Sequence, residues 1–222
     1  MVVAGRAVSE FSSGAEPGSG SGIAPNTVNC QLRGRQHGGT MIELLRAREQ
    51  LYRSTDIKAT VALIRQHRLD HETIIAFAGI IAITTCRFDG RGHFRLADKG
   101  LKSVVIEARG ADAATIVDLI AWPLDDPGRF ATVAGFDVLG ADQIINPASY
   151  ASGSALKAFR SPWAWVQAGC RGCVPLHHQH AGCWLWKALG PIMAEDAEHR
   201  RELQNLLNPP AVPGRRILVP RT

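Results

Sequence analysis

The sequence has no long apolar run and no secretory leader. Its longest apolar run, residues 74–84, is far shorter than the roughly 20 residues that cross a bilayer as a helix. The N-terminal stretch MVVAGRAVSEFSSGAEP also lacks the apolar segment of a signal peptide. We therefore expect a soluble cytoplasmic protein that makes no membrane contact.

Cysteines and catalytic motifs are also scarce. The five cysteines are an odd number in a chain without a signal peptide, which argues against a disulfide framework and for a reducing compartment. The sequence contains no Gly-x-Ser-x-Gly, no His-Glu-x-x-His and no glycine-rich phosphate loop before a helix. These absences remove the usual grounds for naming a reaction.

The composition is that of a globular protein, with 45% hydrophobic and 20% charged residues in a chain of 222. Residues 1–40 are rich in Gly, Ser and Pro and show almost no apolar periodicity, which predicts a disordered tail before a single domain over 41–222. Thr40 and Glu43 have the spacing of a capping box for a helix that starts at Met41. Met41 as the true start codon is the alternative to a disordered tail.

The segment 103–122 has the pattern of a β-hairpin, because two β-branched runs flank a short turn-prone sequence, GAD. Alternation within each run predicts that Ile106, Val117 and Leu119 face the core. We expect an α+β fold whose central, mainly antiparallel sheet is covered by N- and C-terminal helices. Asp118, among apolar neighbours, is either on the exposed face of an edge strand, which is the commoner case, or buried with a partner and a shifted pKa.

Several helices are predicted around this hairpin. One spans 41–53, and a second begins at residue 54 or 55 with Ile57, Val61 and Ile64 on its apolar face. The all-apolar stretch 74–83 is interpreted as a third helix. Further helices are expected after the Ser161 cap and over 181–189 and 192–207.

The stretch between Cys86 and Lys102 is the best candidate for contact with nucleic acid. Basic groups bind phosphate, and aromatic rings stack on unpaired bases. The alternative is a solvated turn that joins a buried element to an edge strand. The basic residues are Arg87, Arg91, Arg95, Lys99 and Lys102, and the rings among them are Phe88, His93 and Phe94. The net charge of +5 permits such contact.

Four of the five tryptophans lie in two pairs with a spacing of two residues. On a helix this spacing turns the pair members about 200° apart, so we expect Trp165 and Trp184 inside and Trp163 and Trp186 outside. The outer pair would form a contact surface for a protein or nucleic-acid partner, beside Arg160, Arg171 and Lys187. A fully buried cluster of all four rings is the alternative.

Cysteines and histidines between 170 and 183 have the spacing of a metal site. Zinc prefers four nitrogen or sulfur ligands, and Cys170, Cys173, His180 (or His178) and Cys183 could supply them. Such a site would be structural, because no spare carboxylate lies nearby to act as a base. The alternative is that the cysteines are small buried apolar residues.

Asp98, Glu107 and Arg109 resemble, over this short stretch, the metal-binding core of the PD-(D/E)xK nucleases. The resemblance implies a Mg²⁺ ion held by the two acids, and a basic residue that orients water. The chain departs from the family with arginine in place of lysine and with a second strand where the family has a helix. Two hypotheses follow: a binding module for nucleic acid or protein, or a Mg²⁺-dependent hydrolase.

Overall fold

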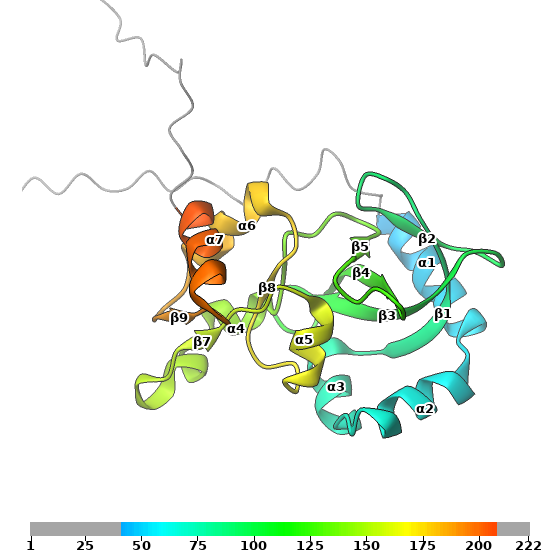
Figure 1. Cartoon of the computed structure of the whole chain (residues 1–222), viewed down its shortest axis with the longest axis horizontal. Coiled ribbons are helices and arrows are strands. Elements are labelled where there is room, and N and C mark those ends of the chain that lie inside the picture. The colour runs from blue at the N-terminus through cyan, green and yellow to red at the C-terminus, as the bar shows by residue number, and fades with distance from the viewer. Residues whose placement is uncertain (1–40, 208–222) are drawn as a thin grey trace, which may run out of the picture.

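The computed structural model describes residues 41–207, apart from the side chains of His178 and Gln179. The predicted tail and the cap at Thr40 lie outside these residues. The described part has mixed helices and strands around a curled antiparallel sheet, which confirms the α+β prediction (Figure 1). The helices are α1 (Met41–Ser54), α2 (Ile57–Gln66), α3 (His71–Ala78), α4 (Ala141–Ile145), the 3₁₀ segment η1 (Pro147–Gly153), α5 (Pro162–Gln167), α6 (His178–Leu185) and α7 (Ala197–Leu207). The strands are β1 (Ile81–Phe88), β2 (Phe94–Leu96), β3 (Leu101–Arg109), β4 (Ile116–Pro123), β5 (Ala131–Thr132), β6 (Val138–Leu139), β7 (Leu156–Lys157), β8 (Val174–Pro175) and β9 (Ile192–Met193).

Five strands form the main sheet in the order β2-β1-β3-β4-β5, and all neighbours are antiparallel. The sheet curls until its two edges meet. His93, next to β2, forms a parallel bridge with Thr132 of β5, whose N–H donates to Gly92 O at 3.0 Å. The remaining strands pair as β6 with β8 and β7 with β9.

The predicted hairpin is β3 and β4, at the centre of the sheet. Ile106 pairs with Ile120 and Glu107 pairs with Leu119. Ile106 and Leu119 are fully buried and Val117 is half-buried, so all three contact a hydrophobic cluster. The alternation placed Val117 and Leu119 on one face, but they pack in different clusters, and the pairing of β3 with β4 shifts its register between Ala108 and Arg109. Ile106 and Leu119 belong to different hydrophobic clusters, so the sheet is covered on both faces.

One face of the sheet is covered by α1, and the other by α2, α3 and α5 (Figure 1). Leu44 and Leu51 of α1 pack in a cluster with small sheet residues such as Ala82, Ala121 and Ala131. Small side chains leave room for the helix against a strongly curved sheet. The opposite face carries the larger cluster around Ile106, Ile120, Trp122 and Trp165.

The apolar face predicted for α2 is wrong at two of its three residues, since only Ile64 packs against the core. Ile57 and Val61 are exposed, and the buried residues are Thr60 and Leu63. The Thr60 hydroxyl donates to Asp56 O and accepts the N–H of Ile83 in β1 at 2.8 Å. Because this polar side chain hydrogen-bonds the neighbouring strand, it is buried in place of its apolar neighbours.

The single helix predicted over 74–83 is two elements, α3 and β1. The change occurs at Gly79, whose φ of +64° favours glycine. A side chain there would also collide with the carboxylate of Glu107, which packs over it. A helix therefore ends at this glycine although the apolar sequence continues.

The C-terminal elements build a third cluster beside the sheet (Figure 1). The helix predicted over 192–207 is wrong in its first part, where Ile192 and Met193 pair with β7. The helix α7 begins only at Ala197, because the Asp196 carboxylate accepts the N–H of His199 at 2.8 Å and caps it. Likewise α6 is shifted from the predicted 181–189 to His178–Leu185.

Asp118 of β4 is fully buried, so the exposure expected as the commoner case is wrong and the alternative, burial with partners, holds. Its carboxylate accepts the backbone N–H groups of Leu119, Val133, Ala134 and Phe136 at 2.7–2.9 Å. Burial raises the pKa of Asp118 to about 6, while the four N–H donors oppose that shift. The carboxylate is therefore ionised at neutral pH and holds the loop after β5 against the sheet.

Candidate nucleic-acid interface

Two arginines face each other across β1 and β2. Arg87 and Arg95 are Cα partners in the antiparallel pair, so both side chains point to the same face of the sheet. Both are exposed, and neither forms an ion pair within residues 41–207. Like charges directly opposite each other destabilise a sheet, so this arrangement concentrates positive charge at a cost in stability.

Lys102 lies on the same face, one step along the sheet. It pairs with Thr85, two residues before Arg87, which places it diagonally across from that arginine. Its Nζ binds Asp56 Oδ2 at 2.9 Å. The pKa of Asp56 is lowered by the N–H of Ala59 and by Lys102, so this carboxylate neutralises part of the lysine charge.

The turn after β1 presents Arg91. Its shape is set by Asp89, whose Oδ1 accepts the N–H groups of Arg91 and His93, both at 2.9 Å. These two hydrogen bonds lower the pKa of Asp89. Lys99 is exposed in the following turn, where Gly100 lies so close to Cys86 O that no side chain would fit.

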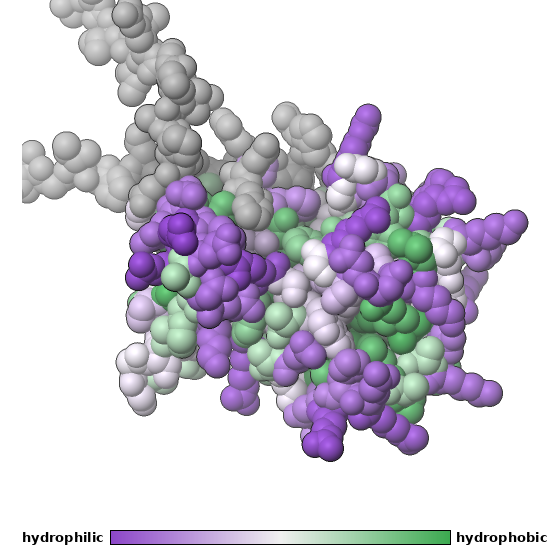
Figure 2. Space-filling model, viewed as in Figure 1, coloured by the Kyte–Doolittle hydropathy of each residue, from purple (hydrophilic) through white to green (hydrophobic). Residues whose placement is uncertain are grey.

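We call Arg87, Arg91, Arg95, Lys99 and Lys102 the basic end. Figure 2 shows long hydrophilic side chains projecting from the side of the molecule where Figure 1 places β1 and β2.

The aromatic residues of this stretch are engaged in packing. Phe94 is 6% exposed and belongs to the cluster under α1. Phe88 is half-buried beside it, and the guanidinium of Arg129 lies 5.4 Å from its ring centroid. These rings are therefore poorly placed to stack on bases, whereas the exposed Arg87 and Arg95, which form no ion pair within residues 41–207, can contact phosphates.

Of the two tryptophans predicted to face outward, Trp186 is exposed and Trp163 is half-buried. The ring of Trp163 lies 4.9 Å from His67 and 6.2 Å from Trp122. Trp186, 68% exposed, follows Trp184 of the third cluster, and its Nε1 donates to Leu207 O at 3.0 Å. Trp163 thus packs against the cluster on the α2 face, whereas Trp186 is exposed at the end of α6, and a partner contact at these two residues stays a prediction. Trp165 is buried behind the hairpin, as predicted.

The predicted zinc ligands are spread over separate environments. Cys170 is buried in the cluster on the α2 face and Cys173 in the third cluster, while His180 is exposed with Nδ1 3.4 Å from Asp137. Burial raises the pKa of both Cys170 and Cys173 to about 12. Cys183 is half-buried on α6.

Within the described residues no group of three or more His, Cys, Asp or Glu side chains is placed to hold a metal. The buried Gln143 holds the backbone of the segment that carries Cys170 and Cys173, because it donates to Cys170 O and accepts the N–H of Gly172. This placement fits the alternative of buried apolar cysteines, and zinc binding stays a prediction.

The three residues of the nuclease resemblance are not brought together. Asp98 is exposed three residues before β3 begins, whereas Glu107 lies near the other end of that strand, six residues or about 20 Å of strand beyond its first residue, Leu101. Glu107 is 3% exposed and pairs with Arg48 of α1 at 2.6 Å. Arg109 donates to the carbonyls of Ile75 and Ala76 at the end of α3. Each residue thus has a structural partner or faces solvent.

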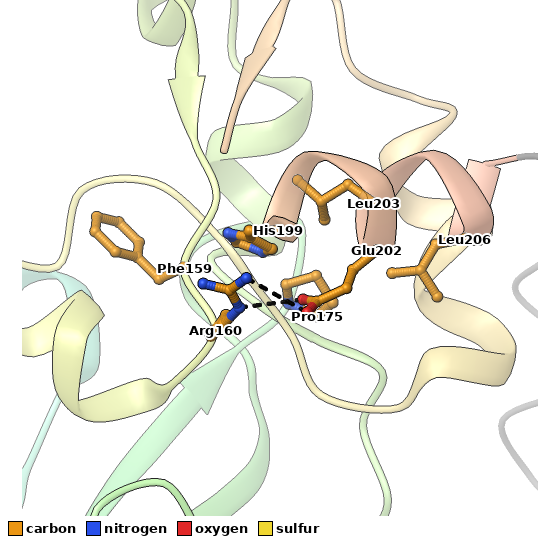
Figure 3. Close-up of a pocket in the computed structure, with 7 residues that line it drawn as sticks. All are labelled: Phe159, Arg160, Pro175, His199, Glu202, Leu203 and Leu206. Atoms are coloured by element: carbon orange, nitrogen blue, oxygen red, sulfur yellow. Dashed lines mark hydrogen bonds and ion pairs between the residues drawn. The ribbon is translucent and has the colours of Figure 1, made fainter. Parts of the chain in front are cut away.

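The structure contains a pocket of about 270 Å³ that the sequence analysis did not predict (Figure 3). Its polar lining is Arg160, His199 and Glu202, and its apolar lining is Phe159, Pro175, Leu203 and Leu206. Four of these residues share one face of α7, at positions 199, 202, 203 and 206. The spacing of these four residues is visible in the sequence. The sequence does not show which residues of other segments face them across the pocket.

No helix within residues 41–207 is long and apolar enough to cross a membrane. Comparison with protein-family models, with curated proteins and with solved structures finds no match to this chain.

Proposed function

We propose that the protein binds nucleic acid through phosphate contacts at the basic end. The observation that supports this most is the pairing of Arg87 with Arg95, exposed and without an acidic partner among the described residues. A phosphate between the two guanidinium groups would remove their repulsion and accept hydrogen bonds from both. Without an anion between them, Arg87 and Arg95 repel each other, and this repulsion lowers the stability of the sheet.

The expected binding is independent of sequence. A protein reads bases either with a helix or ribbon placed in a groove or with exposed rings that stack on the bases. The rings available here are poorly exposed, because Phe94 is buried and Phe88 is half-buried. Phosphate contacts alone release counterions and make affinity strongly dependent on salt. The net charge of +5 favours such association over a contact with a basic protein.

Fluorescence anisotropy with labelled single- and double-stranded oligonucleotides, over a range of salt concentrations, tests the proposal. The double variant Arg87→Gln/Arg95→Gln should weaken binding and reduce the slope of log K against log salt by about 1–2. Arg65→Gln/Arg200→Gln is the matched control, because these arginines are exposed on α2 and α7 and lie outside the basic end. Equal slopes for the two double variants, or no salt-dependent binding by the natural protein, would contradict the proposal.

A further inference from the structure

We propose that the pocket beside α7 binds a small apolar amine that carries a hydrogen-bond acceptor next to its amino group. The pocket is formed by three separate segments: the connection between β7 and α5, the strand β8 and the helix α7 (Figure 3). It is not part of the basic end, so this binding would be a second activity.

The acceptor is inferred from His199, which is only 2% exposed and lines the pocket. Its Nδ1 accepts the N–H of Glu195 at 3.2 Å, so a neutral ring carries its hydrogen on Nε2. Burial, followed by the charge of Arg160, lowers the pKa of His199 and keeps the ring neutral. The Nε2–H group is thus a donor on the pocket wall.

This donor has no protein acceptor among the described residues. The hydrogen bonds and ion pairs of the His199 side chain all involve Nδ1. Within that part of the chain, Arg109 Nε is the one fully buried side-chain polar atom without a partner, so Nε2 keeps access to open space. A ligand oxygen in the pocket would satisfy it.

The positive charge of the ligand is inferred from the acids around Arg160. Its guanidinium pairs with both oxygens of Asp196 and with Glu202, and lies 3.9 Å from Glu198. Its backbone N–H donates to Glu195. The guanidinium thus faces three carboxylates, and a fourth, Glu195, lies at the backbone of the same residue, so the remaining negative charge favours a cationic ligand. Glu202 is the carboxylate in the pocket lining, and each of its oxygens accepts one hydrogen bond from Arg160, at 3.2 and 3.4 Å. A carboxylate oxygen has more than one lone pair, so Glu202 can also accept from an ammonium group in the pocket.

The size and apolar part of the ligand follow from the rest of the wall. Phe159, Pro175, Leu203 and Leu206 supply an apolar surface opposite the polar groups. A volume of about 270 Å³ is slightly below the range of pockets that hold drug-sized molecules. The pocket therefore suits a single ring or a short branched chain attached to the amino and acceptor groups.

Three related compounds test these inferences on the full-length natural protein by methyl NMR of Leu203 and Leu206. Phenylalanine amide has the ring, the ammonium group and the carbonyl oxygen. Phenethylamine lacks the carbonyl, and 3-phenylpropanamide lacks the ammonium group. We expect saturable shifts with phenylalanine amide, and binding about tenfold weaker for each of the other two.

Glu202→Gln keeps the shape of the wall but removes its charge, and should weaken binding of phenylalanine amide about tenfold while leaving 3-phenylpropanamide unchanged. Glu49→Gln, on the exposed face of α1, is the matched control and should bind as the natural protein does. No saturable shift at Leu203 and Leu206, or equal affinity for all three compounds, would overturn the proposal. The compound series needs no substitution, so it decides the question even if Glu202→Gln fails to fold.

Discussion

At the scale of single residues, Asp118 shows why the sequence misled. The segment VDLIAW contains no donor for a carboxylate, so exposure was the natural prediction. The donors come from Val133, Ala134 and Phe136, 15–18 residues further along the chain. A buried acid becomes predictable only when the loop that satisfies it is known, and no local pattern carries that information.

Replacing Asp118 by Asn should destabilise the protein strongly. The amide NH₂ group cannot accept a hydrogen bond, so at least one buried backbone N–H loses its partner, at a cost of about 1–3 kcal/mol. Urea unfolding at pH 7.5, where the natural carboxylate is ionised, measures the loss. Asp112→Asn in the exposed hairpin turn is the comparison, and an equal loss in both variants would show that burial is not the cause.

At the scale of elements, the sequence predicted best what depends on neighbouring residues. Two predictions rest on such local patterns: the Ser161 cap of α5, which accepts the N–H of Ala164 at 3.2 Å, and the two β-branched runs that form β3 and β4. Burial does not alternate in these strands, because residues 103–108 and 118–123 are all buried. The boundary at Gly79 was missed because the apolar run passes through it. The helix ends there through the packing of Glu107, which is 28 residues away.

The two central strands give a prediction for the hairpin. Ile106→Ala and Leu119→Ala should each lower the free energy of unfolding by about 2–5 kcal/mol, because both side chains are fully buried. Leu101→Ala on β3 is the control, since Leu101 is 41% exposed and should cost far less. Thermal melts of the three variants measure this. Unchanged melting temperatures for both buried positions would mean that the strand register is wrong.

At the scale of the whole molecule, the two candidate sites differ in how far they could be predicted. The basic end was found because its five residues lie within one short stretch, 87–102, on consecutive strands and turns. The pocket joins residues 159–160, 175 and 199–206, which only the packing of α7 brings together. Sites of the second kind have no contiguous signature in a single sequence.

A shortened chain that starts at Met41 should fold. Its first helix begins at Met41, and Leu44 and Leu51 attach that helix to the sheet. Loss of the predicted Thr40 cap would cost about 1 kcal/mol, and calorimetry should still show one cooperative transition. An unfolded shortened chain would show that residues 1–40 are required for folding.

The contact between the two edges of the main sheet also bears on how the protein behaves in concentrated solution. The strands most prone to form intermolecular sheets are β3 and β4, with the runs VVIEA and IVDLIAW. Both lie inside the sheet, and the edge strands β2 and β5 are only three and two residues long. The bridge between His93 and Thr132 joins the sheet at those edges, so few backbone groups stay open to a strand from another molecule. Substitutions that open this junction would therefore promote aggregation before they unfold the core.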